Sequence, residues 1–205
     1  GVIIDTSTIK SNAFKNLFDK YSNEFGNFAK AYHLKNEGIS RFEKFDIIKN
    51  KIKKKQKNII IKTNELDTQY SKLILKKILN KKISHGFIKF LKNYKKKFNF
   101  FISSSMPDNE LSYILNKKKI DNHFMHYSGY PPKKNFQIIK IIKNFNIKKK
   151  DIFYIGDTIN DYNVANELNI KFIGYIKYGN KINLNNINII KNFNEIINIT
   201  NKWLY

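Results

Sequence analysis

The 205-residue sequence contains no cysteine, which excludes disulfide bonds and thiolate metal sites. Without disulfides, a cytoplasmic location is the simplest expectation. No apolar run approaches the roughly 20 residues that a transmembrane helix needs, so we expect no membrane partner. Hydrophobic residues still make up 41% of the chain, which is enough for one compact domain or for a core domain with a smaller insertion.

Arginine is almost absent: Arg41 is the only one among 39 basic residues, and the formal net charge is +23. Such a charge suggests nucleic acid as a partner. Nucleic-acid readers favour arginine, however, because its planar fork makes paired hydrogen bonds to bases and phosphates. The lysines here are also spread along the whole chain, as expected when an AT-rich genome drifts from arginine to lysine. We therefore expect no nucleic-acid partner, and a non-catalytic basic binding module stays as an alternative.

The pattern of apolar residues divides the chain into two parts. Between about residues 10 and 80 they recur at spacings of three and four, which is typical of helices. Beyond residue 86, short apolar runs alternate with amphipathic segments, which predicts a parallel α/β sheet. The predicted strands are 98–102, 152–155, 171–175 and 188–191, and 129–132 is predicted to be a loop. We expect an α/β core over 84–205, an all-helical insertion over 11–83, and a short core segment over 1–10.

The strongest signal for chemistry is Gly156-Asp157, directly after the predicted strand 152–155, with Asp161 four residues later. In open parallel sheets, ligands bind outside the carboxyl ends of the strands. A carboxylate placed there can hold a hard cation through oxygen. Asp161 lies one helical turn beyond Asp157, so both can face one cavity. The alternative is a loop aspartate followed by an aspartate that caps a helix.

Two further segments suit an anionic ligand. Ser103 and Ser104 follow the predicted strand 98–102, where a hydroxyl and backbone N–H groups can bind a phosphate. A serine-rich loop with helix caps is the alternative for this segment. Lys133 and Lys134 stand ahead of a predicted helix, whose free N–H groups also favour an anion. Because lysine is so common here, the position of this pair between the other two segments carries the argument.

Together these segments resemble the haloacid dehalogenase superfamily, and within it the phosphoglycolate-phosphatase-like subgroup with a helical cap. Ser103 matches the family's second motif, an apolar strand that ends in serine or threonine. Lys134 matches the third motif best, with Lys133 next. Asp157 and Asp161 match the fourth, Gly-Asp-x-x-x-Asp after an apolar strand. The resemblance implies an α/β fold in which a Rossmannoid parallel-sheet core carries an inserted all-helical cap.

The family's first motif, Asp-x-Asp-Gly-Thr/Val, has no complete match. Asp5 could be its nucleophile only if Ser7 replaced the second aspartate and Thr8 the glycine. The sequence pattern of the subgroup fits better when Gly1 is the glycine of the motif. We therefore expect both catalytic aspartates and the first strand to lie ahead of Gly1. The sheet would then have an open slot for this central strand, and the chain as given would be inactive.

The resemblance also implies a function: Mg²⁺-dependent hydrolysis of a small phosphorylated metabolite, such as phosphoglycolate or a sugar phosphate, through an aspartyl-phosphate. Asp157 would bind Mg²⁺ with the support of Asp161. Ser103, with the N–H of Ser104, would bind phosphoryl oxygens, and Lys134 would offset the growing negative charge. Lys134, Ser103 and Asp161 are thus the expected catalytic set within this chain.

Arg41 and the wider context leave alternatives open. An arginine retained in a lysine-rich chain suggests a need for its planar fork to bind substrate. The alternative is that Arg41 survived by chance or forms a structural salt bridge. A sugar phosphomutase of the same fold is the alternative activity. Since such phosphatases can be joined to sugar-transferring domains, a fusion or partnership of that kind is a further expectation.

Overall fold

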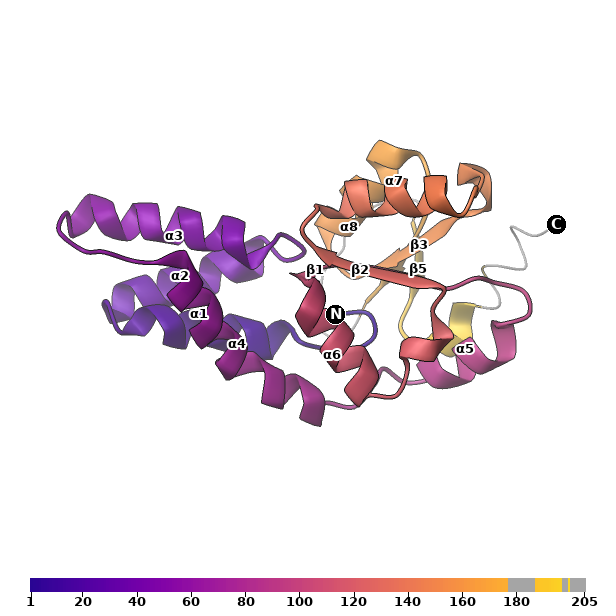
Figure 1. Ribbon diagram of the computed structural model, residues 1–205, viewed down its shortest axis with the longest axis horizontal. Coiled ribbons are helices and arrows are strands. Elements are labelled where there is room, and N and C mark those ends of the chain that lie inside the picture. The colour runs from indigo at the N-terminus through magenta and orange to yellow at the C-terminus, as the bar shows by residue number, and fades with distance from the viewer. Residues whose placement is uncertain (177–186, 197–198, 200–205) are drawn as a thin grey trace. The chain divides into compact units, whose positions relative to one another are not determined.

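The computed structural model describes residues 1–176, 187–196 and 199. The chain divides into two compact units, which Figure 1 colours by residue number: a helical unit, Thr6–Lys81, and an α/β unit formed by Gly1–Asp5 together with Lys82–Tyr205. The sequence placed the edges of the helical insertion at residues 11 and 83. Across the part of the chain that the structure describes, no helix is long and apolar enough to cross a membrane.

The helical unit contains α1 (Ser7–Asp19), α2 (Asn23–Lys35), α3 (Arg41–Lys55) and α4 (Thr63–Asn80). Serine side chains fix the starts of two of them. Ser22 accepts a hydrogen bond from the N–H of Phe25, and Ser40 accepts one from the N–H of Phe42. Helix α1 packs against α2 and α4, and α3 packs against the same two helices.

Aromatic side chains fill the centre of the helical unit. Phe14, Phe18, Phe45 and Tyr70 are all buried, because each lies on the inward stripe of its helix. The ring centroids of Phe14 and Tyr70 are 4.9 Å apart, and those of Phe14 and Phe45 are 5.6 Å apart. Tilted contacts of this kind add to the hydrophobic stabilisation of the unit.

The α/β unit alternates helices and strands along the chain. Its helices are α5 (Phe87–Tyr94), α6 (Asp108–Lys117), α7 (Lys134–Asn144) and α8 (Ile159–Leu168), and its strands are β1 (Phe101–Pro107), β2 (His126–Tyr130), β3 (Phe153–Gly156), β4 (Lys171–Tyr175) and β5 (Asn188–Ile190). The pairs formed by these described strands are parallel. The α/β core with an inserted helical cap is therefore confirmed.

The described strands form two sheets, with β1 paired to β2 and with the order β3-β4-β5 in the other. Between these two sheets, the described strands share no backbone pairing. Side chains meet there: the ring of Phe98, just ahead of β1, lies edge-on to Phe153 of β3 at 5.2 Å. The segment Gly1–Asp5 is tied to the unit where Ser84 donates to the carbonyls of Val2 and Ile3.

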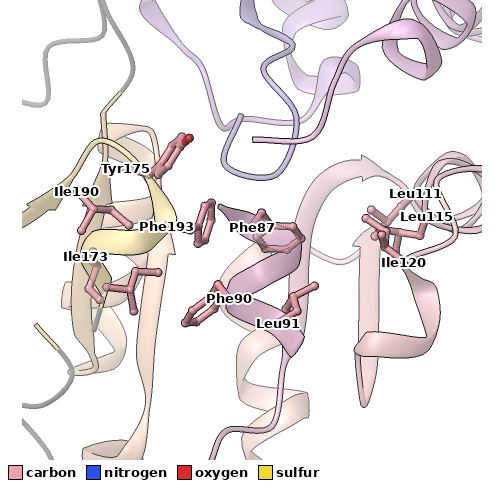
Figure 2. Packing of buried hydrophobic residues seen from close by; sticks show 11 residues of the cluster. Phe87, Phe90, Leu91, Leu111, Leu115, Ile120, Ile173, Tyr175, Ile190 and Phe193 are labelled. Atoms are coloured by element: carbon pink, nitrogen blue, oxygen red, sulfur yellow. The ribbon is translucent and has the colours of Figure 1, made fainter. Parts of the chain in front are cut away.

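Two hydrophobic clusters cover the strands. The larger cluster takes residues from α5, α6 and the ends of β4 and β5 (Figure 2). Its labelled side chains are Phe87, Phe90, Leu91, Leu111, Leu115, Ile120, Ile173, Tyr175, Ile190 and Phe193. The second cluster joins α7 and α8 through Ile138, Val164, Ala165, Leu168 and Ile170. The sheets thus have helices on both faces, as expected for parallel strands.

Two strands differ from the sequence predictions, β1 in its bounds and β2 in being found at all. β1 was predicted over 98–102 but spans Phe101–Pro107, because its serines continue the strand beyond the apolar run. β2, His126–Tyr130, was not predicted, and Gly129 and Tyr130 were placed in a loop. Its side chains are mostly polar or small, so only pairing with β1 identifies it as a strand.

His33 is a buried histidine in the helical unit, with 4% of its surface exposed. Its ring stacks on Phe14 at 4.7 Å, and Nδ1 accepts a hydrogen bond from the ammonium of Lys44 at 3.1 Å. Burial, followed by the positive charges of Lys44 and Lys10, lowers the pKa of His33 from 6.5 to about 2. The folded protein therefore keeps this imidazole neutral, and its stabilising contribution is complete only above pH 6.5.

We predict that acid weakens the protein through His33. Between pH 6.5 and 2 the unfolded chain binds one more proton than the folded chain, so each pH unit of acidification lowers the free energy of unfolding by about 1.4 kcal/mol. The replacement His33→Gln should remove this slope. Urea unfolding of both proteins at several pH values between 7.5 and 4.5 measures it. If the free energy of unfolding fell with pH equally in both proteins, His33 would not be the titrating group.

Candidate active site

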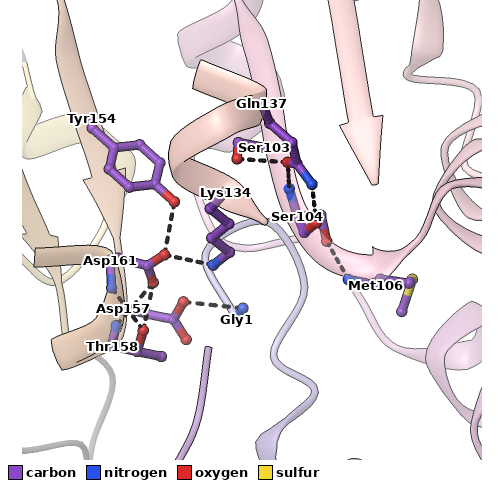
Figure 3. A network of polar contacts seen from close by, with 10 residues as sticks. All are labelled: Gly1, Ser103, Ser104, Met106, Lys134, Gln137, Tyr154, Asp157, Thr158 and Asp161. Carbon is purple, nitrogen blue, oxygen red and sulfur yellow. Dashed lines mark hydrogen bonds and ion pairs between the residues drawn. The ribbon is translucent and has the colours of Figure 1, made fainter. Parts of the chain in front are cut away.

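Asp157 lies at the carboxyl end of β3, where the sequence predicts a cation-binding carboxylate. The strand ends at Gly156, and Asp157 is the next residue. Its side chain is 15% exposed, and Oδ1 lies 3.2 Å from the N-terminal ammonium of Gly1 (Figure 3). A Cβ atom at position 1 would lie 1.9 Å from Asp157 Oδ2, so a larger residue there would require the Asp157 carboxylate to turn aside. The main-chain nitrogen of Gly1 therefore lies close to the carboxylate.

Asp161, the third residue of α8, is 2% exposed and has donors on both carboxylate oxygens. Oδ1 accepts from Lys134 Nζ at 2.5 Å and from the hydroxyl of Tyr154 at 2.7 Å. Oδ2 accepts from the Oγ1 and the N–H of Thr158, which caps α8. These four contacts match the acceptor capacity of a carboxylate. The arrangement fits a supporting role for Asp161 better than a direct bond to a cation.

Burial and charge act on Asp161 in opposite directions. Burial by itself raises its pKa, but the charge of Lys134 and the hydrogen bonds from Lys134, Tyr154 and Thr158 lower it to about 2. For Tyr154, burial and then the negative charge of Asp161 raise the pKa of the phenol well above 10. At neutral pH, an ionised Asp161 therefore faces a protonated Tyr154.

Lys134 reaches this site from the segment that follows β2, which belongs to the other sheet. It is the first residue of α7, which follows β2, whereas Asp161 lies on α8, which follows β3. Its side chain is only 11% exposed and makes the ion pair with Asp161. Lys133 precedes the helix and is exposed. Of the two candidate lysines, the structure thus places Lys134 beside the aspartates.

Ser103 and Ser104 lie in β1, and a side chain that the sequence analysis missed engages both. The hydroxyl of Ser103 donates to Gln137 Oε1 at 2.7 Å, and the N–H of Ser104 donates to the same oxygen at 3.0 Å (Figure 3). The hydroxyl of Ser104 accepts from the N–H of Met106 at 3.1 Å. Both donors that the sequence analysis assigned to phosphate are thus held by one amide oxygen, and their phosphate contact stays a prediction.

Arg41 is 7% exposed and is held within the helical unit. Its Nε lies 2.6 Å from Asp67 Oδ1, an ion pair without hydrogen-bond geometry, and Nη2 donates to Ser71 Oγ at 3.0 Å. The guanidinium also lies over the ring of Tyr70, with 5.3 Å to the centroid. These three partners belong to α4, so Arg41 makes the structural salt bridge of the two alternatives. Its contact with substrate stays a prediction.

The oxygen chemistry of Asp157 suits Mg²⁺, because hard cations prefer carboxylate ligands and Mg²⁺ keeps several waters. Among the residues that the structure describes, no group of three or more His, Cys, Asp or Glu side chains could hold a metal ion. The residues present therefore fit one carboxylate ligand of such an ion, Asp157, supported by Asp161.

Sequence reasoning missed Gln137, Tyr154 and Thr158. Thr158 had a usable signal: a threonine three residues ahead of an acidic residue marks a capping box, which the structure contains. Gln137 lies four residues before Ile141 on the buried face of α7, so a polar residue interrupts an apolar stripe there. Tyr154 gave no such signal, because a tyrosine inside an apolar strand is ordinary.

One protein-family model matches most of this chain. The model for haloacid dehalogenase-like hydrolases matches residues 1–175. No match was found among the curated proteins.

Solved structures share the fold. A β-phosphoglucomutase from Clostridium difficile has a TM-score of 0.76 and 21% identity, covering 100% of this chain and 93% of that chain. A predicted phosphoglycolate phosphatase from Haemophilus somnus has a TM-score of 0.75 and 15% identity, covering 97% and 93%. A predicted phosphatase from Clostridium acetobutylicum has a TM-score of 0.73 and 18% identity, covering 98% and 94%. At these identities the likeness shows the fold alone.

The pair of Lys134 and Asp161 should dominate the energetics of the site. Lys134→Met removes the ammonium and leaves a buried carboxylate with less compensation, so we expect a loss of roughly 3 kcal/mol in the free energy of unfolding at neutral pH. The matched control is Lys133→Met, an exposed neighbour that should change stability by less than about 0.5 kcal/mol. Chemical denaturation of both variants measures this difference, and equal losses would contradict the assignment of Lys134.

Proposed function

Because the chain belongs to the haloacid dehalogenase-like hydrolase family, we propose that it forms most of a Mg²⁺-dependent phosphatase that acts on a small phosphorylated metabolite. The observation that carries the proposal is that a lysine and two aspartates from different segments lie close together. Asp157 and Asp161 follow β3, and Lys134, which follows β2, reaches Asp161 across the interruption between the two sheets (Figure 3). Hydroxyl and N–H groups of β1 complete a set suited to a phosphate and a cation.

The proposed reaction needs a nucleophilic aspartate. We propose that an aspartate ahead of Gly1 attacks phosphorus, so that an oxygen–phosphorus bond forms while the bond to the leaving oxygen breaks. A second aspartate protonates the leaving oxygen and then takes a proton from the water that cleaves the aspartyl-phosphate. The position of the Gly1 nitrogen, 3.2 Å from Asp157 Oδ1, supports this proposal, because a residue bonded to that nitrogen would enter the same site. The chain beginning at Gly1 would then be inactive alone.

The residues of this chain would supply the electrostatic frame for that transfer. Asp157 would hold Mg²⁺, which when bound offsets the repulsion between a carboxylate nucleophile and a phosphate. Asp161 would hold Lys134 in place, and the ammonium of Lys134 would stabilise the charge that grows on the phosphoryl oxygens. The segment of β1 around Ser103 and Ser104 would provide hydrogen-bond donors to the same oxygens.

Phosphoglycolate and sugar phosphates are the substrates that we propose to test first, since solved structures with this fold include a predicted phosphoglycolate phosphatase and a β-phosphoglucomutase. A sugar phosphomutase is the second candidate, supported only by the shared fold. It is distinguished by its product, since a mutase returns an isomeric sugar phosphate and a phosphatase releases phosphate. A sugar-transferring domain as a fused or separate partner, and a cytoplasmic location, remain part of the proposal.

The proposal predicts Mg²⁺-dependent phosphate release from a protein that carries an Asp-x-Asp segment ahead of Gly1, and none from the chain that begins at Gly1. In the extended protein, Asp157→Asn should lower kcat/KM by at least about 100-fold, because it removes the carboxylate that holds the cation. Phosphate release from a panel of phosphorylated metabolites, with and without Mg²⁺, measures both effects.

The matched control for Asp157→Asn is Asp151→Asn. Asp151 is exposed and precedes β3 at the opposite end of the strand, so this variant should keep wild-type activity. Undiminished Mg²⁺-dependent release by Asp157→Asn would rule out the metal role of Asp157. An extended protein that releases no phosphate, yet is retained on DNA in a salt-sensitive way, would favour the basic binding module instead.

A further inference from the structure

Gln137 is a polar residue whose side chain the fold buries among backbone groups. It is the fourth residue of α7, which packs against β1 and β2, and it is 1% exposed. A primary amide placed there without partners would be costly, because each of its donors and acceptors would lose its bonds to water. The contacts that it makes therefore explain why the fold tolerates it.

The carboxamide of Gln137 is saturated on both sides. Its Oε1 accepts from the Ser103 hydroxyl and from the Ser104 N–H (Figure 3). Its Nε2 lies within hydrogen-bond distance of three carbonyl oxygens: 3.0 Å from Ser104, 2.8 Å from Gly129 and 2.7 Å from Pro132. Since an amide nitrogen has two hydrogens, these three acceptors share them. One side chain thus bonds to both the N–H and the C=O of Ser104, as a neighbouring strand would.

This bonding coincides with an irregularity in the sheet. Ser103 pairs with Ser128 and Pro107 pairs with Tyr130, so residues 104–106 of β1 lie opposite Gly129 alone. Such a bulge removes backbone groups from the ladder, and bulges beside active sites re-aim side chains. The amide of Gln137 bonds to Ser104 and Gly129, which lie in the irregular part of the ladder between β1 and β2. It therefore stabilises the bulge from within.

The bulge decides where the two serine hydroxyls point. Consecutive residues of a strand face opposite sides of the sheet, and the Ser103 hydroxyl is turned toward α7 and bound to Gln137. The Ser104 hydroxyl accepts from the N–H of Met106, and a hydroxyl that accepts one hydrogen bond still has its own hydrogen to donate. The bond from Gln137 to the carbonyl of Pro132 also fixes the loop just ahead of Lys134.

We propose that Gln137 is a positioning residue for phosphate recognition: by holding the bulge after Ser103, it presents the hydroxyl of Ser104 and the helix start at Lys134 to the same phosphoryl group. Ser103 then serves as an anchor for Gln137. This inference rests on the proposed function, since it concerns how that site binds its substrate.

The extended protein with Gln137→Met and Gln137→Glu tests the inference. Methionine keeps the length of the side chain and loses every hydrogen bond, so KM and the inhibition constant of inorganic phosphate should rise by about tenfold or more, with a smaller change in kcat. Glutamate keeps the acceptor but places an oxygen against three carbonyls. Its defect should lessen as the pH falls, because a protonated glutamate can donate again, whereas the methionine variant should show no such recovery.

Two serine variants supply the comparison. Ser104→Ala should lower kcat/KM by about 100-fold, as expected when a donor to developing charge is lost. Ser103→Ala should cost less than about tenfold, because Gln137 keeps its bond to the Ser104 N–H. A larger loss of kcat/KM for Ser103→Ala than for Ser104→Ala would overturn the inference. Ser103 would then be the phosphate ligand, and Gln137 would only occupy the position of the phosphate.

Amide hydrogen exchange separates this inference from the proposed function. The Ser104 N–H should exchange at least about tenfold faster in Gln137→Met than in the wild type, when both are compared at equal global stability from unfolding curves. Unchanged exchange, or a wild-type KM in the methionine variant, would contradict the role of Gln137. If the wild-type extended protein released no phosphate, the proposed function would fail, while the exchange result would still decide whether Gln137 holds Ser104.

Discussion

The site depends on the buried ion pair between Lys134 and Asp161, because it joins two different sheets. Lys134 follows strand β2 of one sheet, and Asp161 follows strand β3 of the other. In the described chain, the ladder β1-β2 and the ladder β3-β4-β5 share no backbone pairing. Packing of α7 on α8 and this ion pair therefore fix the carboxyl end of one sheet relative to the other. A salt bridge that is this buried stabilises little by itself, since removing both charges from water is costly. Its value here lies in geometry, and Tyr154 and Thr158 complete that geometry.

The two aspartates of one motif have different chemistry because their surroundings differ. Asp161 lies inside the capping box of α8 and has protein donors on both oxygens. Asp157 lies one turn earlier and stays partly exposed. A cation is therefore better placed on Asp157, whereas Asp161 orients the lysine. The spacing Gly-Asp-x-x-x-Asp alone does not distinguish these roles, since it does not indicate which carboxylate will form the cap of the helix.

The sequence predicted the parts of the fold in which local pattern and tertiary packing agree. The strand Lys171–Tyr175 was predicted with its observed bounds, because an apolar run flanked by polar residues suits a buried strand. β2 was missed because its partly polar residues become a strand only through pairing with β1. Asp157, Asp161 and Lys134 could be named from their order along the chain. Gln137 could not, because its role depends on a bulge that arises from the register of two strands.

The clearest test of the account is a crystal structure of the protein with an Asp-x-Asp segment ahead of Gly1, grown with Mg²⁺ and orthovanadate as a phosphate analogue. The account predicts Mg²⁺ bound to a carboxylate oxygen of Asp157, with the vanadate in hydrogen-bond contact with the Ser104 hydroxyl and the Lys134 ammonium. Asp161 should keep its bonds to Lys134, Tyr154 and Thr158. Vanadate bound away from these residues, or Mg²⁺ bound to Asp161 with Lys134 displaced, would contradict it.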